Sequence, residues 1–536
     1  MWQQNYTPIG DSLALSASVA AIPIAVLLLM LGVFRKPAWV AALAGLGAAA
    51  AVALFGYGMP ASMVAGAVTL GASFGLLPIG WIVFSAILLY RLTVETGKFE
   101  IIKDSVGSLT PDRRLQALLI AFAFGAFIEG AAGFGSPVAV AAAMLTGLGF
   151  SPFYAAGICL LANTAPVAFG SIGIPVTTLA LTTGLPVKEL SAAVGSICAP
   201  VSLFVPAYLI LVMGGWKALR GVWPAALICG VTFAGLQFVV SNYVGPELVD
   251  ITSSLAAIAS LVILFKLWKP KDTFHLEGES TEAPVLKKHN GSELFWAWMP
   301  YLLLVVFVLI WGQKGVQAKL NTFTLIIEWP WLHNLIQQIP PAVVRPKNYE
   351  ALYRFNWLSA AGTACVFATI LAAALLRVSP RKFAGILGQT LQQLAKPLLT
   401  IATVLALAFL MNYSGATATL GLAFASTGPT FPFFSALLGW LGVFLTGSDT
   451  SANALFGNLQ VVTANRLGLD PVLMASANSA GGVMGKMISL QSIAVAAAAT
   501  GMRPEEEAKL FRFTLRHSVF LASVIGLVTV FYAYWL

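Results

Sequence analysis

Long apolar runs separated by short polar turns dominate the pattern of hydrophobic and polar positions along the chain. The first run covers residues 12–34 and ends at Arg35 and Lys36. A helix needs about 20 apolar residues to cross the hydrocarbon core, and most runs reach that length. Loops rich in Lys and Arg follow alternate runs, as cytoplasmic loops do. The pattern predicts an all-α polytopic membrane protein with about 12–14 membrane segments and a periplasmic N-terminus.

Two neighbouring segments interrupt this pattern with glycine-rich breaks. Residues 115–149 form two apolar arms around the stretch Glu129–Pro137, and neither arm alone is as long as a crossing. We expect a re-entrant hairpin, since backbone groups at membrane depth must be satisfied by protein or by a cavity. The next run, 152–183, carries two glycines and two prolines after Asn163. It predicts a broken helix.

The same arrangement recurs in the second half of the chain. Gly125–Gly130 matches Gly442–Gly447, and Ala162–Ala165 matches Ala477–Ala480 at nearly the same offset, which indicates an internal duplication. The second hairpin is expected to have arms at 430–446 and 454–465, followed by a span, 471–499, broken around Asn478 to Ser489. An odd number of predicted crossings separates the hairpins, so the repeats are inverted. Inverted repeats with discontinuous helices are typical of secondary transporters.

These features predict the organisation of the whole chain. Residues 62–95 are long for one crossing and short for two, and the basic cluster that follows favours one net inward crossing. The expected parts are N-terminal scaffold helices at 1–110, a first repeat core at 111–185, scaffold helices at 186–267, a cytoplasmic loop at 268–293, scaffold helices at 294–428 with an external loop at 313–356, a second repeat core at 429–500 and a C-terminal helix within 501–536.

Composition supports the membrane assignment and excludes other classes. With 58% hydrophobic and 10% charged residues, the chain is too apolar for a soluble globule. The net charge of +9 comes from short loops between apolar spans, so it reflects membrane topology and not a nucleic-acid surface. Membrane lipid is therefore an expected partner, and nucleic acid is not. The four cysteines lie singly in apolar stretches and are expected to act as small apolar side chains.

Each copy of the duplicated block holds one acid in apolar sequence, Glu129 in the first and Asp449 in the second. Acids at membrane depth usually face a polar pathway or a partner. Burial disfavours the charged form of a carboxyl and a nearby lysine favours it, so an acid that changes partners can carry a proton. Glu129 is the first candidate for this role and Asp449 the second. The alternative for Glu129 is an acid that hydrogen-bonds the hairpin backbone.

Several segments resemble the bacterial L-lactate permease family over nearly the whole chain. They are Trp2–Tyr6, Phe124–Gly135, Asn163–Gly170, Gly439–Thr450 and Gly485–Ser489. The resemblance implies proton-coupled uptake of L-lactate, or of D-lactate or glycolate, across the bacterial inner membrane. It also implies an elevator-type transporter, a homodimer, and no cofactor besides the coupling ion. Three positions depart from the family pattern, namely Ser136, Ala452 and Leu490, and Leu490 puts in doubt how the second half-helix begins.

A 2-hydroxy acid requires a cation or N–H donors for its carboxylate and polar groups for its hydroxyl. Lys486 is the Lys or Arg that lies in the apolar core of the two blocks, so it is the first candidate for the carboxylate; the alternative is a structural ion pair with Asp449. Half-helix N-termini favour anions, which adds the helix starts expected near Ser171 and Ser489. The remaining substrate-binding candidates are Asn163, Thr164, Asn478, Ser479 and Thr450.

Other functions fit the sequence less well. A membrane enzyme would need a nucleophile or metal constellation, and the spans contain no Ser/His/Asp or His/Cys cluster. A channel needs a continuous pore, whereas paired broken helices with buried acids suit alternating access. The rival within transporters is a sodium-coupled carrier of another organic anion, because the Asn-Thr and Asn-Ser pairs resemble sodium sites of related families. Dependence of uptake on sodium or on pH distinguishes the two.

Overall fold

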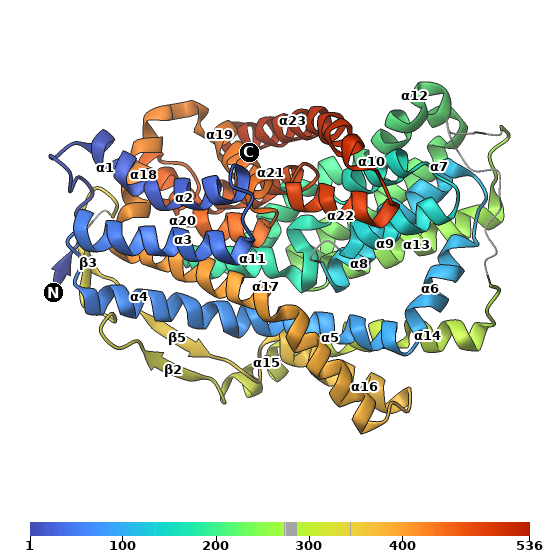
Figure 1. Cartoon of the computed structure of the whole chain (residues 1–536), viewed down its shortest axis with the longest axis horizontal. Helices are drawn as coiled ribbons and strands as arrows, with labels where there is room; N and C mark the ends of the chain where they lie inside the picture. The colour runs from blue at the N-terminus through green and yellow to red at the C-terminus, as the bar shows by residue number, and fades with distance from the viewer. Residues whose placement is uncertain (134–135, 273, 275–286, 344, 536) are drawn as a thin grey trace.

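The computed structural model describes residues 1–133, 136–272, 274, 287–343 and 345–535, and this part of the chain is built mainly of helices (Figure 1). Eleven helical segments are long and apolar enough to cross a membrane, or 12 when one bent pair counts as a span. The prediction of an all-α polytopic membrane protein is therefore confirmed, at the lower end of the expected number of segments. The sidedness of the loops stays a prediction.

The N-terminal scaffold consists of helices joined by short turns. The first predicted run, 12–34, is two helices, and the segment 62–95 is one long candidate span broken at Leu77, beside Pro78. Proline has no N–H to continue the helical hydrogen bonds, so a break there is expected. The elements are α1 (Leu13–Ala20), α2 (Ile22–Gly32), α3 (Ala38–Ala51), η1 (Val52–Gly56), α4 (Ala61–Phe74), η2 (Gly75–Gly80), α5 (Trp81–Glu95) and α6 (Lys98–Gly107).

The first repeat has a longer first arm than predicted. Helix runs without a break through α7 (Arg113–Gln116), η3 (Ala117–Phe124) and α8 (Gly125–Ala131). These 19 residues are long enough to cross a membrane, and all of them except Arg113 are buried. The expectation that neither arm reaches a crossing is therefore wrong for this arm. Gly130 continues the helix and lets it approach a neighbouring helix, because a Cβ there would come within 2.7 Å of the Asp250 Cβ. Residues 134–135 of the predicted tip lie outside the described residues.

The rest of the first repeat agrees with the prediction of a broken helix. It comprises α9 (Ser136–Gly147), α10 (Pro152–Ala162), η4 (Val167–Phe169) and α11 (Gly170–Thr183). The axes of the two long halves, Pro152–Ala162 and Val167–Thr183, differ by 62°. Asn163 ends the first half as its C-cap.

The scaffold continues with α12 (Val187–Tyr243), α13 (Val249–Leu267), α14 (Gly291–Gly312), α16 (Ala361–Leu375), α17 (Pro380–Ser414) and α18 (Ala416–Phe424). The scaffold helices predicted at 186–267 correspond to α12 and α13, and the backbone of α12 leaves helical geometry at Gly214, Gly215 and Val222. Half of the predicted cytoplasmic loop 268–293, namely residues 273 and 275–286, lies outside the described residues.

The predicted external loop at 313–356 contains ordered elements that the sequence pattern did not indicate. They are α15 (Lys314–Asn321) and four strands, β2 (Leu325–Glu328), β3 (Ile336–Gln338), β4 (Lys347–Asn348) and β5 (Leu352–Phe355). Strand β2 pairs with β5 antiparallel, with Leu325 opposite Phe355. Strand β3 pairs with β4 and, in parallel, with the N-terminal β1 (Trp2–Gln3). The amide of Gln4 then donates to the Asn412 and Tyr413 carbonyls, which ties the N-terminus to the end of α17.

The second repeat is formed by η5 (Ala425–Thr430), α19 (Phe431–Thr446), α20 (Asp449–Leu467), α21 (Pro471–Lys486) and α22 (Leu490–Thr500), and α23 (Pro504–Trp535) follows it. The second arm begins at Asp449 and not at 454, because Ser448 caps its N-terminus by accepting a hydrogen bond from the Ser451 N–H. The span 471–499 is broken only at residues 487–489.

Helices of the two predicted repeats pack against one another in the middle of the molecule. Helix α11 packs on α20, and α22 lies against α9 and α10 (Figure 1). Within the second repeat, α19 and α21 approach at glycines: a Cβ at Gly481 would collide with the Ala436 carbonyl, and one at Gly439 with the Asn478 carbonyl. This close contact of helix backbones positions the residues that follow at the ends of α19 and α21.

Candidate functional site

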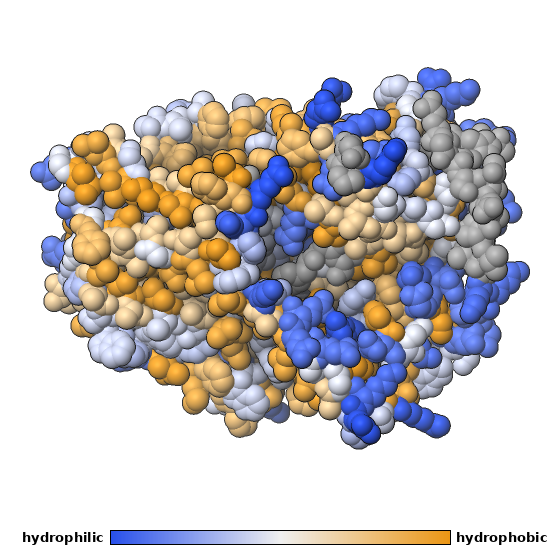
Figure 2. All heavy atoms as spheres, viewed as in Figure 1, coloured by the Kyte–Doolittle hydropathy of each residue, from blue (hydrophilic) through white to orange (hydrophobic). Residues whose placement is uncertain are grey.

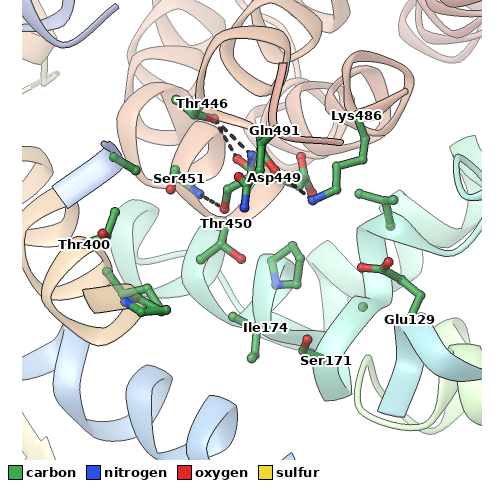
Figure 3. A pocket seen from close by; sticks show the side chains of 18 of the residues that line it. Glu129, Ser171, Ile174, Thr400, Thr446, Asp449, Thr450, Ser451, Lys486 and Gln491 are labelled. Carbon is green, nitrogen blue, oxygen red and sulfur yellow. Dashed lines mark hydrogen bonds between the residues drawn. The ribbon is translucent and has the colours of Figure 1, made fainter. Parts of the chain in front are cut away.

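A cavity of about 270 Å³ lies where the two repeats meet α3 and α17. This is at the small end of ligand pockets, which suits a small solute. Figure 2 shows the surface hollowed near the centre of the molecule, beside strongly hydrophilic residues. Five predicted site residues line the cavity: Glu129, Ser171, Asp449, Thr450 and Lys486. Residues far apart in the sequence are thus brought to one place (Figure 3).

Glu129 lies near the end of α8 and is only 5% exposed. Its Oε2 is buried without a hydrogen-bond partner, and the charges that act on the carboxyl include Lys486. A Cβ at Gly170 would come within 2.6 Å of Oε1, so the glycine leaves room for the carboxyl. The described contacts do not support the alternative in which Glu129 hydrogen-bonds the hairpin backbone.

Asp449 is the first residue of α20, and its carboxyl accepts more hydrogen bonds than that of Glu129. Its Oδ2 accepts hydrogen bonds from Ser479 Oγ at 2.7 Å and from Asn453 Nδ2 at 3.3 Å, while Oδ1 is buried without a partner. Hydrogen bonds to an ionised carboxylate stabilise its charged form. Glu129 and Asp449 therefore face the same cavity in different environments.

Lys486 ends α21 and is 9% exposed. Its Nζ donates to the Gly447 carbonyl at 2.7 Å. Among the described residues it forms no ion pair with Asp449, although it acts electrostatically on both Asp449 and Glu129. In Figure 3 its ammonium lies between these two acids, which come from different repeats. Two further N–H donor positions on Lys486 remain for an anion.

The two half-helix starts differ from each other. Ser489 is the N-cap of α22 and accepts from the Ser492 N–H, so Leu490 at the first helical position does not disturb the start. Ser171, Ile172 and Gly173 have positive φ angles, and regular helix begins only after them. The expected helix start near Ser171 is therefore wrong by a few residues. Gly173 packs against Pro246, where a side chain would collide.

Five candidates lie outside the lining of the cavity. Asn163 is buried, and its side chain affects the Glu129 carboxyl without lining the cavity. The Thr164 hydroxyl donates to the Leu161 carbonyl. Asn478 donates to Asn453 Oδ1, Ser479 to Asp449, and Ser489 caps α22. Asn478 and Ser479 stand inside regular helix, so the expectation that the second break begins there is wrong. These side chains position the groups that line the cavity.

Two functional candidates were missed in the sequence. Gln491 lines the cavity in the first turn of α22, and Asp250 lies fully buried in the first turn of α13, beside Gly130. Both Asp250 oxygens lack a hydrogen-bond partner. The signal for Asp250 was the same as for Glu129, an acid inside an apolar run. It stood outside the duplicated blocks.

The cavity combines two lysines, the buried Lys486 and the exposed Lys396 at its α17 side, with unpartnered carboxyl oxygens and neutral polar groups. An anion fits beside Lys486, and the Thr450 hydroxyl and the Gln491 amide are available for a polar substituent. The Ser171 hydroxyl donates to the Ala132 carbonyl, so it can only accept. The arrangement is chemically suited to hold a small organic anion beside a carboxyl group. Within the described residues no group of three or more His, Cys, Asp or Glu is placed to hold a metal ion.

Comparison with known proteins identifies the family of the chain. The chain is 47% identical to the L-lactate permease of Bacillus subtilis (strain 168), with 98% of each chain covered. It is 46% identical to the glycolate permease GlcA of Escherichia coli (strain K12), covering 99% of this chain and 98% of the relative. A solved transporter, YdaH of Alcanivorax borkumensis, covers 88% of this chain and 87% of its own at 14% identity, with a TM-score of only 0.44. The family model described as L-lactate permease matches residues 16–536, and the chain belongs to the L-lactate permease family.

Proposed function

We propose that this multi-pass membrane protein is a secondary transporter that imports L-lactate, and related 2-hydroxy acids such as D-lactate or glycolate, with protons across the bacterial inner membrane. The relatives are named L-lactate permease and glycolate permease, which supports a lactate or glycolate transporter and not an enzyme. The observation that carries the proposal is Lys486, a buried ammonium between two acids in a small cavity.

The coupling follows from charge balance around Lys486. In the empty site the ammonium offsets the negative charge of Glu129 or Asp449. A substrate carboxylate that binds Lys486 removes this compensation, and a buried acid without a cation favours its neutral form. Glu129, whose Oε2 has no hydrogen-bond donor, then takes up a proton more readily than Asp449, which keeps two donors.

The energetics determine what such coupling achieves. One lactate anion moving with one proton carries no net charge, so the membrane potential contributes nothing. Each pH unit supplies about 1.4 kcal/mol, enough for about tenfold accumulation. The two repeats, which pack against each other, would move together across the membrane as the transport unit of an elevator. Contacts within a homodimer would keep the scaffold helices fixed in the membrane.

The test is uptake of labelled L-lactate into proteoliposomes with an imposed inward pH gradient and no sodium. The wild type is expected to accumulate lactate, whereas Glu129→Gln keeps lactate exchange but not accumulation, because a glutamine stays neutral. Glu100→Gln, an exposed acid paired with Lys103, serves as control and is expected to behave as wild type. Uptake that ignores pH and follows sodium would contradict proton coupling and favour a sodium-coupled carrier.

A further inference from the structure

The inference concerns Asp250, which has no role in the function proposed above. It lies in the first turn of α13 and is 1% exposed. Both carboxyl oxygens are buried without a hydrogen-bond partner. A charged carboxylate in such a place is strongly disfavoured, so an acid at this position calls for a physical explanation.

Asp250 is a close neighbour of Glu129. A Cβ at Gly130 would come within 2.7 Å of the Asp250 Cβ and 3.1 Å of Ile251, so α8 and α13 touch at this point. The carboxyls of Asp250 and Glu129 interact electrostatically. Two like charges that interact in a buried site disfavour each other, so the pair favours a state with at least one proton.

The surroundings decide which of the two holds that proton. Lys486 acts on Glu129 and favours its carboxylate, whereas the charged group that acts on Asp250, within the described part of the chain, is Glu129 itself. A proton held by the pair is therefore assigned to Asp250, because Lys486 compensates the charge of Glu129 and no described cation compensates that of Asp250. From α12 the Cys198 thiol also lies within electrostatic range of Asp250. The other helices packed on α13, namely α11 and η3, have no Asp, Glu, His, Lys or Arg in their sequences.

Asp250 is also able to release its proton. It stands in the first turn of a 19-residue helix, where the partial positive charge of the helix N-terminus stabilises a carboxylate. Glu247, one turn earlier in the chain, lines a separate cavity of about 540 Å³. Leu248, the N-cap of α13, lines the same cavity, so the end of the helix that carries Asp250 borders a space from which water can return a proton.

We propose that Asp250 is the internal proton donor to Glu129. When a substrate carboxylate binds Lys486, the Asp250 carboxyl gives its proton to the Glu129 carboxylate, directly or through one water molecule. Asp250 becomes a carboxylate and is then reprotonated from water. The net uptake is one proton for each substrate anion. The inference rests on the proposed role of Glu129 and adds the route by which that proton arrives.

The route predicts an effect on rate and none on the extent of coupling. In Asp250→Asn, Glu129 must take its proton from water in the cavity, which is fast at acidic pH and slow at alkaline pH. Net uptake should therefore equal that of the wild type at acidic pH and fall by roughly tenfold or more at alkaline pH. The final accumulation ratio in a given pH gradient should not change.

The experiment measures initial rates of labelled L-lactate uptake across a pH series in proteoliposomes, together with exchange at acidic pH. Ser253→Ala is the matched control, since this buried hydroxyl lies one turn further along α13 and also lacks a partner. A wild-type pH profile in Asp250→Asn would overturn the donor role, and so would loss of exchange at acidic pH, because exchange does not need the donor. If the wild type itself fails to accumulate lactate in a pH gradient, the proposed function is wrong. If only the pH profile of Asp250→Asn is unchanged, the donor role alone is wrong.

Discussion

The ammonium of Lys486 donates a hydrogen bond to the carbonyl of Gly447, at 2.7 Å. Gly447 ends α19 with a φ of +72°, a conformation that glycine adopts without strain, and this aims its carbonyl at the cavity. The lysine is thus held by a neutral acceptor and not by an ion pair. A neutral acceptor is released more easily than a carboxylate when an anion arrives.

Lys486→Gln should weaken substrate binding. Hydrogen bonds to charged groups contribute about 1.5–3 kcal/mol, so the KM for lactate exchange should rise by roughly 10- to 100-fold. Counterflow in proteoliposomes measures this directly. Lys103→Gln, an exposed residue paired with Glu100, is the control and should leave KM unchanged. An unchanged KM with a lower Tm in Lys486→Gln would instead indicate a structural lysine.

Ser479 and Asp449 should behave as one unit in a double-mutant cycle. Because Ser479 Oγ donates to Asp449 Oδ2 at 2.7 Å, Ser479→Ala and Asp449→Asn remove the same interaction. Their effects on the free energy of unfolding should be non-additive, with a coupling of about 1.5–3 kcal/mol. Thermal unfolding of the two single variants and the double variant in detergent provides the measurement. Additive effects would show that the hydrogen bond contributes nothing.

Gly481→Ala should separate α19 from α21. The added methyl would meet the Ala436 carbonyl, which belongs to a helix backbone and cannot move alone. Overpacking of this kind costs about 1–3 kcal/mol. The expected result is a lower Tm and loss of transport. Gly235→Ala in α12 is the matched control, since nothing lies within 4 Å of a Cβ there. Equal Tm values for both variants would contradict the predicted contact.

The ion pair of Arg114 with Asp272 should make stability depend on acidic pH. Arg114 donates to both Asp272 oxygens, at 2.8 and 3.0 Å, and these hydrogen bonds lower the pKa of Asp272. A pKa that is lower in the folded state stabilises the protein above the ordinary value of about 3.9 and loses this effect as pH falls below it. Asp272→Asn should therefore lower Tm at neutral pH.

The same comparison at acidic pH serves as the control for that ion pair. Once Asp272 is protonated in both states, the wild type and Asp272→Asn should unfold at similar temperatures. A Tm difference that stays constant from neutral to strongly acidic pH would show that the charge of Asp272 has no part in stability.

The sequence alone indicated that the chain is a membrane protein and that a span is broken after Asn163. It also singled out Glu129, Asp449 and Lys486, which line the cavity. The reason is that burial in lipid imposes long apolar runs, against which a single charge or a cluster of Gly and Pro is conspicuous. These signals are local, so they are readable without knowledge of contacts. The inverted orientation of the repeats and the elevator motion remain predictions.

Only the tertiary structure decided which of these residues meet. Glu129 and Lys486, which come from different predicted repeats, line the same cavity. Asn478 and Ser479 do not line it, and Ser479 instead donates to Asp449. Asp250 lies within electrostatic range of Glu129. Helix breaks also shifted, because glycines such as Gly481 were used for close helix packing and not for breaking the helix. Glycine has the same identity in both roles, and only its neighbours in space determine which role it takes.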